Sequence, residues 1–151
     1  MPGVLTHSPS DIVRQLLVNL NLGVDSTTDT TSDWPIYESR EPDLPDDCIT
    51  IYNTADKLQG RTQNDGETQG QEGIQIRVRS TDPVNGQLKA RSILVAIDTQ
   101  VLQSVVNLEG RSYRIPALNR TTGVLSLFKE VPTTKRNLYT INATAAIRQL
   151  S

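Results

Sequence analysis

The sequence predicts an α+β fold, in which two helices pack on one face of a mixed, mainly antiparallel sheet. Two segments carry apolar residues at helical spacing, and several shorter segments alternate apolar and polar residues as strands do. The two helical stripes both need an apolar surface to cover, which one face of a sheet can supply. With 151 residues, the chain (residues 1–151) is expected to form a single domain.

The first predicted helix runs from about Pro9 to Leu22. Ser8 can cap its N-terminus, Pro9 suits the first helical position, and Asp11 can bond back to the cap. Gly23 favours an end to the helix. The apolar stripe of this helix consists of Ile12, Val13, Leu16, Leu17 and Leu20.

Two strands are predicted next, on either side of a turn. Residues 24–33 are rich in Asp, Ser and Thr, whose side chains compete for backbone hydrogen bonds, so this segment is expected to be a loop. Trp34–Ser39 is predicted to be a short strand. The prolines and aspartates between Pro42 and Asp47 indicate a turn. Cys48–Tyr52 alternates and is rich in β-branched residues, which is typical of a strand.

A polar segment follows, from about residue 53 to residue 72. Leu58 is its only large apolar side chain. Because such a segment buries too little apolar surface to offset its ordering entropy, it is predicted to be a flexible loop in the free monomer. Loops of this length within compact domains are often functional. We therefore expect Leu58 and its neighbours to become ordered on assembly.

Gly73–Ser80 has the clearest alternation in the sequence. Its apolar residues point to one face, which is expected to belong to the core, and its polar residues point to the other. That second face is expected to be wet and to serve in interactions. It consists of Gln75, Arg77 and Arg79.

The second predicted helix runs from about Pro83 to Gln103, with Asp82 as its N-cap. Its inward stripe consists of Ala90, Leu94, Ile97 and Val101. A run of antiparallel strands should follow the helix. They are predicted at residues 105–108, 111–115, 124–130 and 136–146, with Glu109 and Gly110 in a hairpin-like turn.

Charge is unevenly distributed, although the net charge is only −2. Residues 25–47 hold eight acidic side chains against one arginine, and residues 111–136 hold six basic side chains against one glutamate. These segments are either two solvated surfaces or complementary patches that meet between subunits. Under the second interpretation, the residues expected to take part are Asp46, Asp47, Arg111, Arg114 and Arg120.

The sequence contains no pattern that indicates catalysis, a metal or a cofactor, so the protein is not expected to be an enzyme. The only histidine, His7, is expected to lie in a frayed N-terminus, and without a second histidine no His-based metal cluster can form. The only cysteine, Cys48, begins an apolar strand and is expected to be buried. Phosphate-loop and dinucleotide motifs are absent from the sequence.

Membrane and nucleic-acid functions are not favoured either. No apolar run approaches the length of a transmembrane helix, and the N-terminal residues do not resemble a signal peptide. We therefore expect a soluble protein made in a cytoplasm. Sequence-specific recognition of nucleic acid would need a basic recognition helix or interleaved aromatic residues, and neither is evident in the sequence.

The order of segments resembles the minor capsid or tail-terminator proteins of long-tailed bacteriophages, over about residues 8–147. The resemblance rests on Pro45–Tyr52, a polar gap, and Gly73–Arg79 followed directly by a helix. It continues in Arg114–Pro116 and in the final strand, Leu138–Thr144. The chain departs from the family after its first main strand, where it has Asn53–Asp56 in place of an Asp-Thr-Gly-Gly type turn.

The resemblance implies a structural virion protein at the head–tail junction. Such a protein forms a homohexameric ring on the last ring of the tail tube and stops tube growth. It presents a surface to the head-side connector or stopper protein and leaves an open lumen through which DNA passes without sequence-specific binding. Another neck or head–tail connector protein is the alternative, followed by a small enzymatic or nucleic-acid-binding domain. Carried over to this chain, the resemblance places Gln75, Arg77 and Arg79 on the polar face of the central strand.

Overall fold

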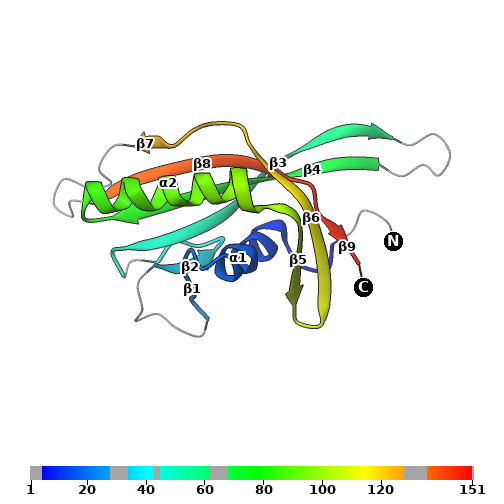
Figure 1. The fold of residues 1–151 in the computed structure, drawn as a ribbon, viewed down its shortest axis with the longest axis horizontal. Coiled ribbons are helices and arrows are strands. Elements are labelled where there is room, and N and C mark those ends of the chain that lie inside the picture. Colours follow the sequence, from blue (N-terminus) through cyan, green and yellow to red (C-terminus); the bar gives the residue numbers. More distant parts are fainter. Residues whose placement is uncertain (1–4, 28–33, 43–44, 62–67, 128–135, 151) are drawn as a thin grey trace.

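The computed structural model describes residues 5–27, 34–42, 45–61, 68–127 and 136–150. Within these residues the chain forms two helices, α1 (Pro9–Asn19) and α2 (Pro83–Gln100), and a nine-stranded sheet (Figure 1). The strands are β1 (Val24–Asp25), β2 (Pro35–Glu38), β3 (Cys48–Arg61), β4 (Thr68–Ser80), β5 (Leu102–Leu108), β6 (Arg111–Arg120), β7 (Leu125–Leu127), β8 (Asn137–Ala145) and β9 (Arg148–Gln149).

The sheet is mixed and mainly antiparallel, as the sequence predicts. Its main path runs β1-β2-β3-β4-β8-β6-β5, while β7 pairs with β8 and β9 pairs with β6. Only the pairings of β1 with β2 and of β2 with β3 are parallel in the described part of the sheet. Since the helices and this sheet are the predicted components, the α+β fold class is confirmed.

Both helices pack on the same face of the sheet. Helix α2 lies over β4, β6 and β8, and α1 contacts β2, β3 and β5 (Figure 1). The face of the sheet that the helices cover is aliphatic. Ile51, Ile76 and Ile141 lie opposite one another on β3, β4 and β8, and all three are fully buried. Each fully buried isoleucine contributes roughly 1.5–3 kcal/mol. The aliphatic core therefore makes up for the small number of aromatic residues.

The helix termini follow their predicted caps at the N-terminal ends but not at the C-terminal ends. The side chain of Ser8 accepts a hydrogen bond from the backbone N–H of Asp11, and the side chain of Asp82 accepts one from Val84. Helix α1 ends at Asn19 rather than at Leu22, and α2 ends at Gln100 rather than at Gln103. In each case apolar residues continue the periodicity into the following turn or strand, where they are still buried.

The predicted flexible loop at residues 53–72 is wrong for most of its length. Strand β3 continues to Arg61 and β4 begins at Thr68, with Leu58 opposite Gly70 and Arg61 opposite Thr68. Residues 62–67 lie outside the described part of the chain. The prediction failed because backbone hydrogen bonds hold the two strands of a hairpin together without requiring apolar side chains.

The outer part of this hairpin is a two-stranded arm, which we define as residues 57–61 and 68–71. Strand β8 pairs with β4 only from Glu72 to Ser80, so within the described residues the arm strands pair only with each other. The β3–β4 pairing is interrupted by two register shifts, one of them between Thr54 and Lys57. Figure 1 shows the two arm strands projecting from one end of the sheet. The described residues of the predicted 53–72 loop therefore belong partly to the three-stranded part of the sheet and partly to this arm.

Candidate interaction surfaces

The polar face of β4 is not the wet surface that the sequence predicts. Arg79 is only 1% exposed. Its guanidinium donates hydrogen bonds to the backbone carbonyls of Pro45 (2.7 Å) and Asp46 (3.1 Å). These carbonyls belong to the segment between β2 and β3, which crosses this face of the sheet. The arginine therefore holds that segment to the sheet and is not presented to a partner.

Arg77 and Gln75 also find partners within the chain. The guanidinium of Arg77 lies 5.3 Å from the centre of the Tyr52 ring and 3.5 Å from the carboxylate of Glu41. Gln75 donates a hydrogen bond to the side chain of Asn142 (3.1 Å). The Arg77 side chain is still 28% exposed, so this residue retains some access to a partner that Arg79 lacks.

Three buried side-chain atoms in and beneath the segment between β2 and β3 lack hydrogen-bond partners among the described residues: Oε1 of Glu41 in the segment, and Oγ1 of Thr50 and Nε of Arg77 on the strands. Thr50 is opposite Arg77 in the β3–β4 register. Each unsatisfied buried group costs about 1–3 kcal/mol. The polar side of the sheet is therefore covered less favourably than the aliphatic side, which has no unsatisfied buried side-chain atom among the described residues.

Cys48 lies in this region and is fully buried, as predicted. Burial raises the pKa of its thiol to about 11, and the nearby charge of Arg79 opposes this shift only in part. A thiol with such a pKa is almost entirely protonated at neutral pH, and the thiolate is the nucleophilic form. The side chain of Cys48 therefore serves as a buried part of the core.

The acidic and basic segments already meet within a single chain. The guanidinium of Arg136 binds the carboxylate of Asp46 at 2.8 Å. Asp47 accepts a hydrogen bond from the backbone N–H of Thr81 (3.1 Å). Pairing of the two segments between subunits stays a prediction, but Asp46 already has a partner in its own chain.

The three predicted arginines of β6 differ in their surroundings. Arg120 binds both carboxylate oxygens of Asp98 on α2, each at 3.0 Å. Arg111 and Arg114 are exposed, and Arg114 lies opposite Val105 in the β5–β6 register. Arg111 and Arg114 are therefore the arginines of this group that are best placed for an external contact.

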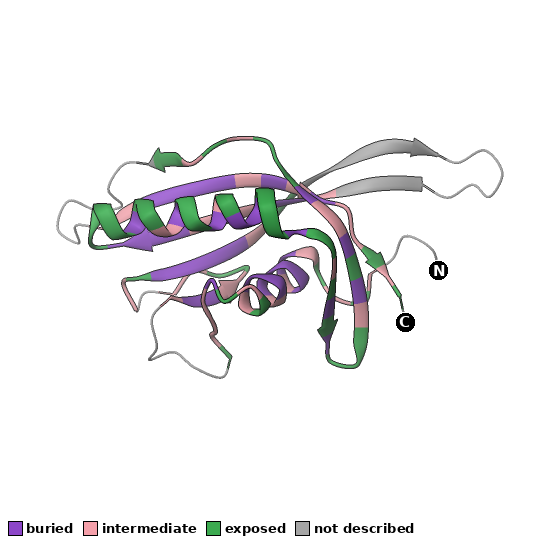
Figure 2. Ribbon diagram, in the orientation of Figure 1, coloured by how far each residue is buried: buried purple, intermediate pink, exposed green. Residues whose placement is uncertain are grey.

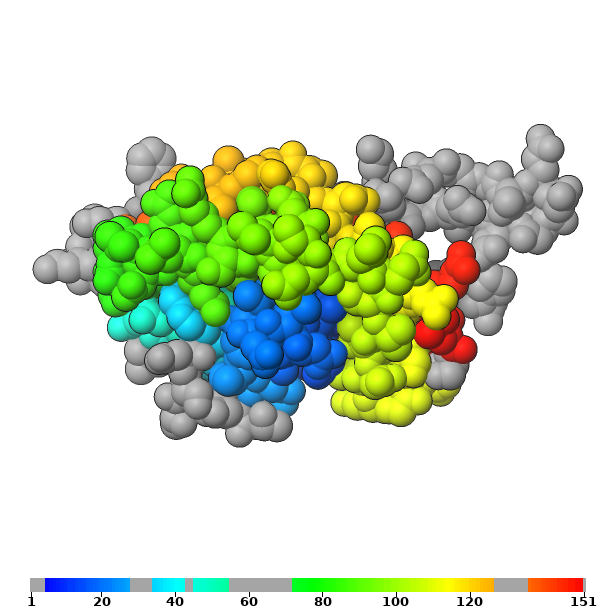
Figure 3. Space-filling model, in the orientation of Figure 1, coloured from blue at the N-terminus to red at the C-terminus, as the bar shows by residue number. Residues whose placement is uncertain are grey.

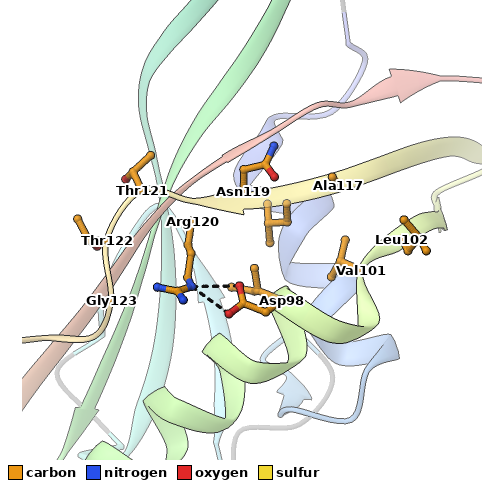
Figure 4. A pocket seen from close by; sticks show the side chains of 11 residues that line it. Asp98, Val101, Leu102, Ala117, Asn119, Arg120, Thr121, Thr122 and Gly123 are labelled. Carbon is orange, nitrogen blue, oxygen red and sulfur yellow. Dashed lines mark hydrogen bonds and ion pairs between the residues drawn. The ribbon is translucent and has the colours of Figure 1, made fainter.

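A groove of about 560 Å³ lies where the end of α2 meets β6 (Figure 4). The Asp98–Arg120 ion pair crosses it, as the dashed lines in Figure 4 show. One wall is the 121–123 turn, and Val101 and Leu102 line the other end. The ionisable side chains that line the groove are bound to each other, and its other lining residues are apolar or carry amide and hydroxyl groups. The charged groups of the groove are therefore already taken up by this ion pair.

The prediction of a frayed N-terminus around His7 is wrong. Nδ1 of His7 lies within hydrogen-bond distance of the Tyr113 hydroxyl, and Nε2 lies 3.2 Å from the carboxylate of Glu109. The backbone N–H of His7 also donates to the Tyr113 hydroxyl (3.2 Å). His7 thereby attaches the start of the chain to the β5–β6 hairpin. Sequence reasoning missed this contact because it joins residues more than 100 positions apart.

Sequence reasoning also missed an apolar stripe on the outer face of α2. Figure 2 shows exposed residues along the side of this helix that faces away from the sheet, and Figure 3 shows that side at the molecular surface. The sequence signal was available, because Leu88, Val95 and Leu102 recur every seven residues. We call the following residues the α2 stripe: Val84 (64% exposed), Leu88 (58%) and Val95 (55%), with Ser92 and Thr99 beside them, and Leu102 (77%), the first residue of β5, just past the helix end.

The described residues contain neither a cluster of potential metal ligands nor a membrane-spanning helix. No group of three or more His, Cys, Asp or Glu side chains is arranged there to hold a metal ion. Neither described helix combines the length and the apolar character needed to cross a membrane.

The fold and these surfaces define an α+β domain whose most distinctive exposed features are a two-stranded arm and an apolar helix face. No protein-family model matches the chain, and no curated protein matches it. Its function therefore has to be argued from the residues and surfaces described above.

Proposed function

We propose that this protein is a structural virion subunit that forms a homohexameric ring, caps the tail tube of a long-tailed bacteriophage and joins it to the head-side connector. The observation that carries the proposal is the two-stranded arm. It agrees with the expectation stated above that Leu58 and its neighbours become ordered on assembly.

The arm suits an assembly contact for a physical reason. An isolated two-stranded hairpin is marginally stable in water and usually needs a third strand or a packing surface. Strand β8 supplies that support only up to Glu72, so within the described residues the arm lacks it. A neighbouring subunit or the tube would complete the packing, and Leu58, opposite Gly70, lies within this arm.

The rest of the described structure is consistent with an assembly role. The α2 stripe is an exposed apolar surface, and contiguous surfaces of this kind often mark contacts with other proteins. Arg111 and Arg114 are exposed on β6. In a ring these arginines would be repeated in every subunit and could line a lumen that tolerates the phosphate backbone of passing DNA.

The test is to mix the purified protein with its tail-tube protein and to measure tube length and complex mass. The proposal predicts tubes of limited length that carry a ring of this protein at one end. A variant in which residues 57–71 are replaced by Asn-Gly should fold, because the β4–β8 pairing starts at Glu72, but it should no longer cap tubes. The exposed-site variant Gly123→Ala is the matched control and should cap normally.

Tubes of unchanged length that carry none of this protein would overturn the proposal. Binding to the head-side connector without binding to tubes would point instead to a connector protein on the capsid side.

A further inference from the structure

The α2 stripe is more apolar than its sequence suggests, because its two hydroxyl residues turn their donors inward. The hydroxyl of Ser92 donates to the backbone carbonyl of Leu88 (2.9 Å), and that of Thr99 donates to the carbonyl of Val95 (2.7 Å). With these donors satisfied, both side chains can be covered by a partner at little cost in lost hydrogen bonds with water. A partner could therefore cover the middle of the stripe without leaving these hydroxyl donors unsatisfied.

The stripe is also close to symmetric about Val95. Leu88 precedes Val95 by seven residues and Leu102 follows it by seven. Ser92 precedes Val95 by three residues and Thr99 follows it by four. Leu102 is the first residue of β5 and lies past the helix end, so the symmetry of the helix itself rests on Val95 and its neighbours. When the helix is placed antiparallel to a copy of itself with Val95 against Val95, Ser92 of each copy lies beside Thr99 of the other. Val95 then meets its own copy, and the small hydroxyl residues pair beside it.

The charges beside the stripe follow the same symmetry. Arg91 precedes Val95 by four residues, and Asp98 follows it by three. In the antiparallel arrangement these opposite charges come within reach of each other twice, once on each side of the two-fold axis. Asp98 is 38% exposed and accepts both of its described bonds from one nitrogen of Arg120, so its oxygens can accept further hydrogen bonds.

We propose that α2 binds α2 of a second copy of this chain, antiparallel, across a two-fold axis at Val95. The occupant of the stripe is thus a second copy, because Val95, the Ser92 and Thr99 positions and the charges all match when the helix is reversed onto itself. The face is accessible, since α2 covers the sheet on one side only and its outer side forms the surface seen in Figure 3.

This contact goes beyond the proposed ring. A two-fold contact is closed after two copies, whereas ring growth needs head-to-tail contacts. The α2 contact therefore pairs free subunits or joins subunits of two rings, while the ring itself uses other surfaces. One helix pair makes a small interface, so the free dimer is expected to be in concentration-dependent exchange with the monomer.

The first test is the mass of the free protein over a range of concentrations. The mass should rise from 16.7 kDa towards twice that value as concentration increases. Val95→Glu places a carboxylate on the two-fold axis and should keep the protein monomeric. Leu125→Glu changes an apolar residue on β7 that is 44% exposed, and it should leave the association unchanged.

The second test is cysteine cross-linking, which reports orientation. In a Cys48→Ala background, Val95→Cys should form a disulfide-linked dimer on mild oxidation, and Leu125→Cys should not. A mixture of Ser92→Cys and Thr99→Cys chains should cross-link to each other in preference to themselves.

A protein that stays monomeric and gives no Val95 cross-link overturns the inference, even if it caps tail tubes. Preferred cross-linking of Ser92 to Ser92 would exclude the antiparallel arrangement. Conversely, a Val95 dimer that never caps tubes would support this contact and reject the proposed function.

Discussion

Gly86 on helix α2 lies directly against the ring of Tyr139 on strand β8. A Cβ atom at Gly86 would stand 2.8 Å from Cε2 of that ring and 3.0 Å from Cβ of Ser80. The hydroxyl of Tyr139 donates a hydrogen bond to the carbonyl of Pro83 in the first turn of the same helix (3.0 Å). The missing side chain at Gly86 thus lets the start of α2 approach the sheet.

This contact predicts that Gly86→Ala destabilises the protein although alanine is the better helix former. The gain in helix propensity is about 1 kcal/mol. Overpacking against Tyr139 and Ser80 typically costs about 1–3 kcal/mol, so we expect a net loss of about 1 kcal/mol. Urea unfolding measures it, with Gly123→Ala as the control, because a Cβ there meets nothing within 4 Å. A stabilised Gly86→Ala variant would contradict the close packing.

Replacing Arg79 should destabilise the fold more than replacing an exposed arginine. Arg79→Met removes the hydrogen bonds to the carbonyls of Pro45 and Asp46 and leaves polar groups of that segment without a donor. We expect a loss of about 3 kcal/mol in the free energy of unfolding. Arg114→Met, on the exposed side of β6, should change it by less than about 0.5 kcal/mol. Equal effects of the two substitutions would argue against a buried Arg79.

The thiol of Cys48 should be unreactive in the folded protein. Its burial and its pKa of about 11 leave little accessible thiolate at pH 8. Labelling with a thiol reagent should therefore be slow in buffer and fast in denaturant, where the whole chain is exposed. Rapid labelling of the folded protein would show that the segment over Cys48 opens readily.

Asp25 should make stability depend on pH in the acid range. Burial tends to raise the pKa of its carboxyl, but hydrogen bonds from Thr27 and Arg14 outweigh that effect and lower the pKa below 3.8. A lowered pKa in the folded state gives stability that is present above the ordinary pKa and is lost as pH falls through the folded value.

The comparison of wild type with Asp25→Asn tests this dependence. The wild type should be more stable at pH 7, and the difference should shrink as the pH falls below 3.8. Thermal melts across this range measure it. A difference that stays constant with pH would show that the charge of Asp25 is not what Arg14 and Thr27 recognise.

The sequence was sufficient to predict the parts of the fold that depend on local periodicity. Helix α1 begins at its predicted cap, and Gly73–Ser80 forms a strand with its apolar side in the core. The C-terminal ends of the helices were less predictable. Apolar residues such as Leu22 and Val101 stay buried after the helix has ended, and periodicity alone does not distinguish the two cases.

The candidate surfaces were predicted less well, because their character depends on what packs over them. Alternation correctly placed Arg79 opposite the core, but it could not show that the segment before Cys48 crosses that face. The polar composition of residues 53–72 suggested a loop, whereas cross-strand hydrogen bonds extend both strands into it. Conversely, the seven-residue repeat of Leu88, Val95 and Leu102 can be seen in the sequence. Only the structure shows that these residues point to solvent and not to the core.

The two ends of the described chain are joined, which has a kinetic consequence. Thr6 donates to the side chain of Gln149 through its backbone N–H (3.0 Å) and its hydroxyl (3.2 Å), across 143 residues. Closing so long a loop is entropically costly, so contacts of this span tend to form late in folding. A folding chain would thus complete its central hairpin and helix early. The contacts between residues 5–7 and 148–150 would be the last to form and the first to break.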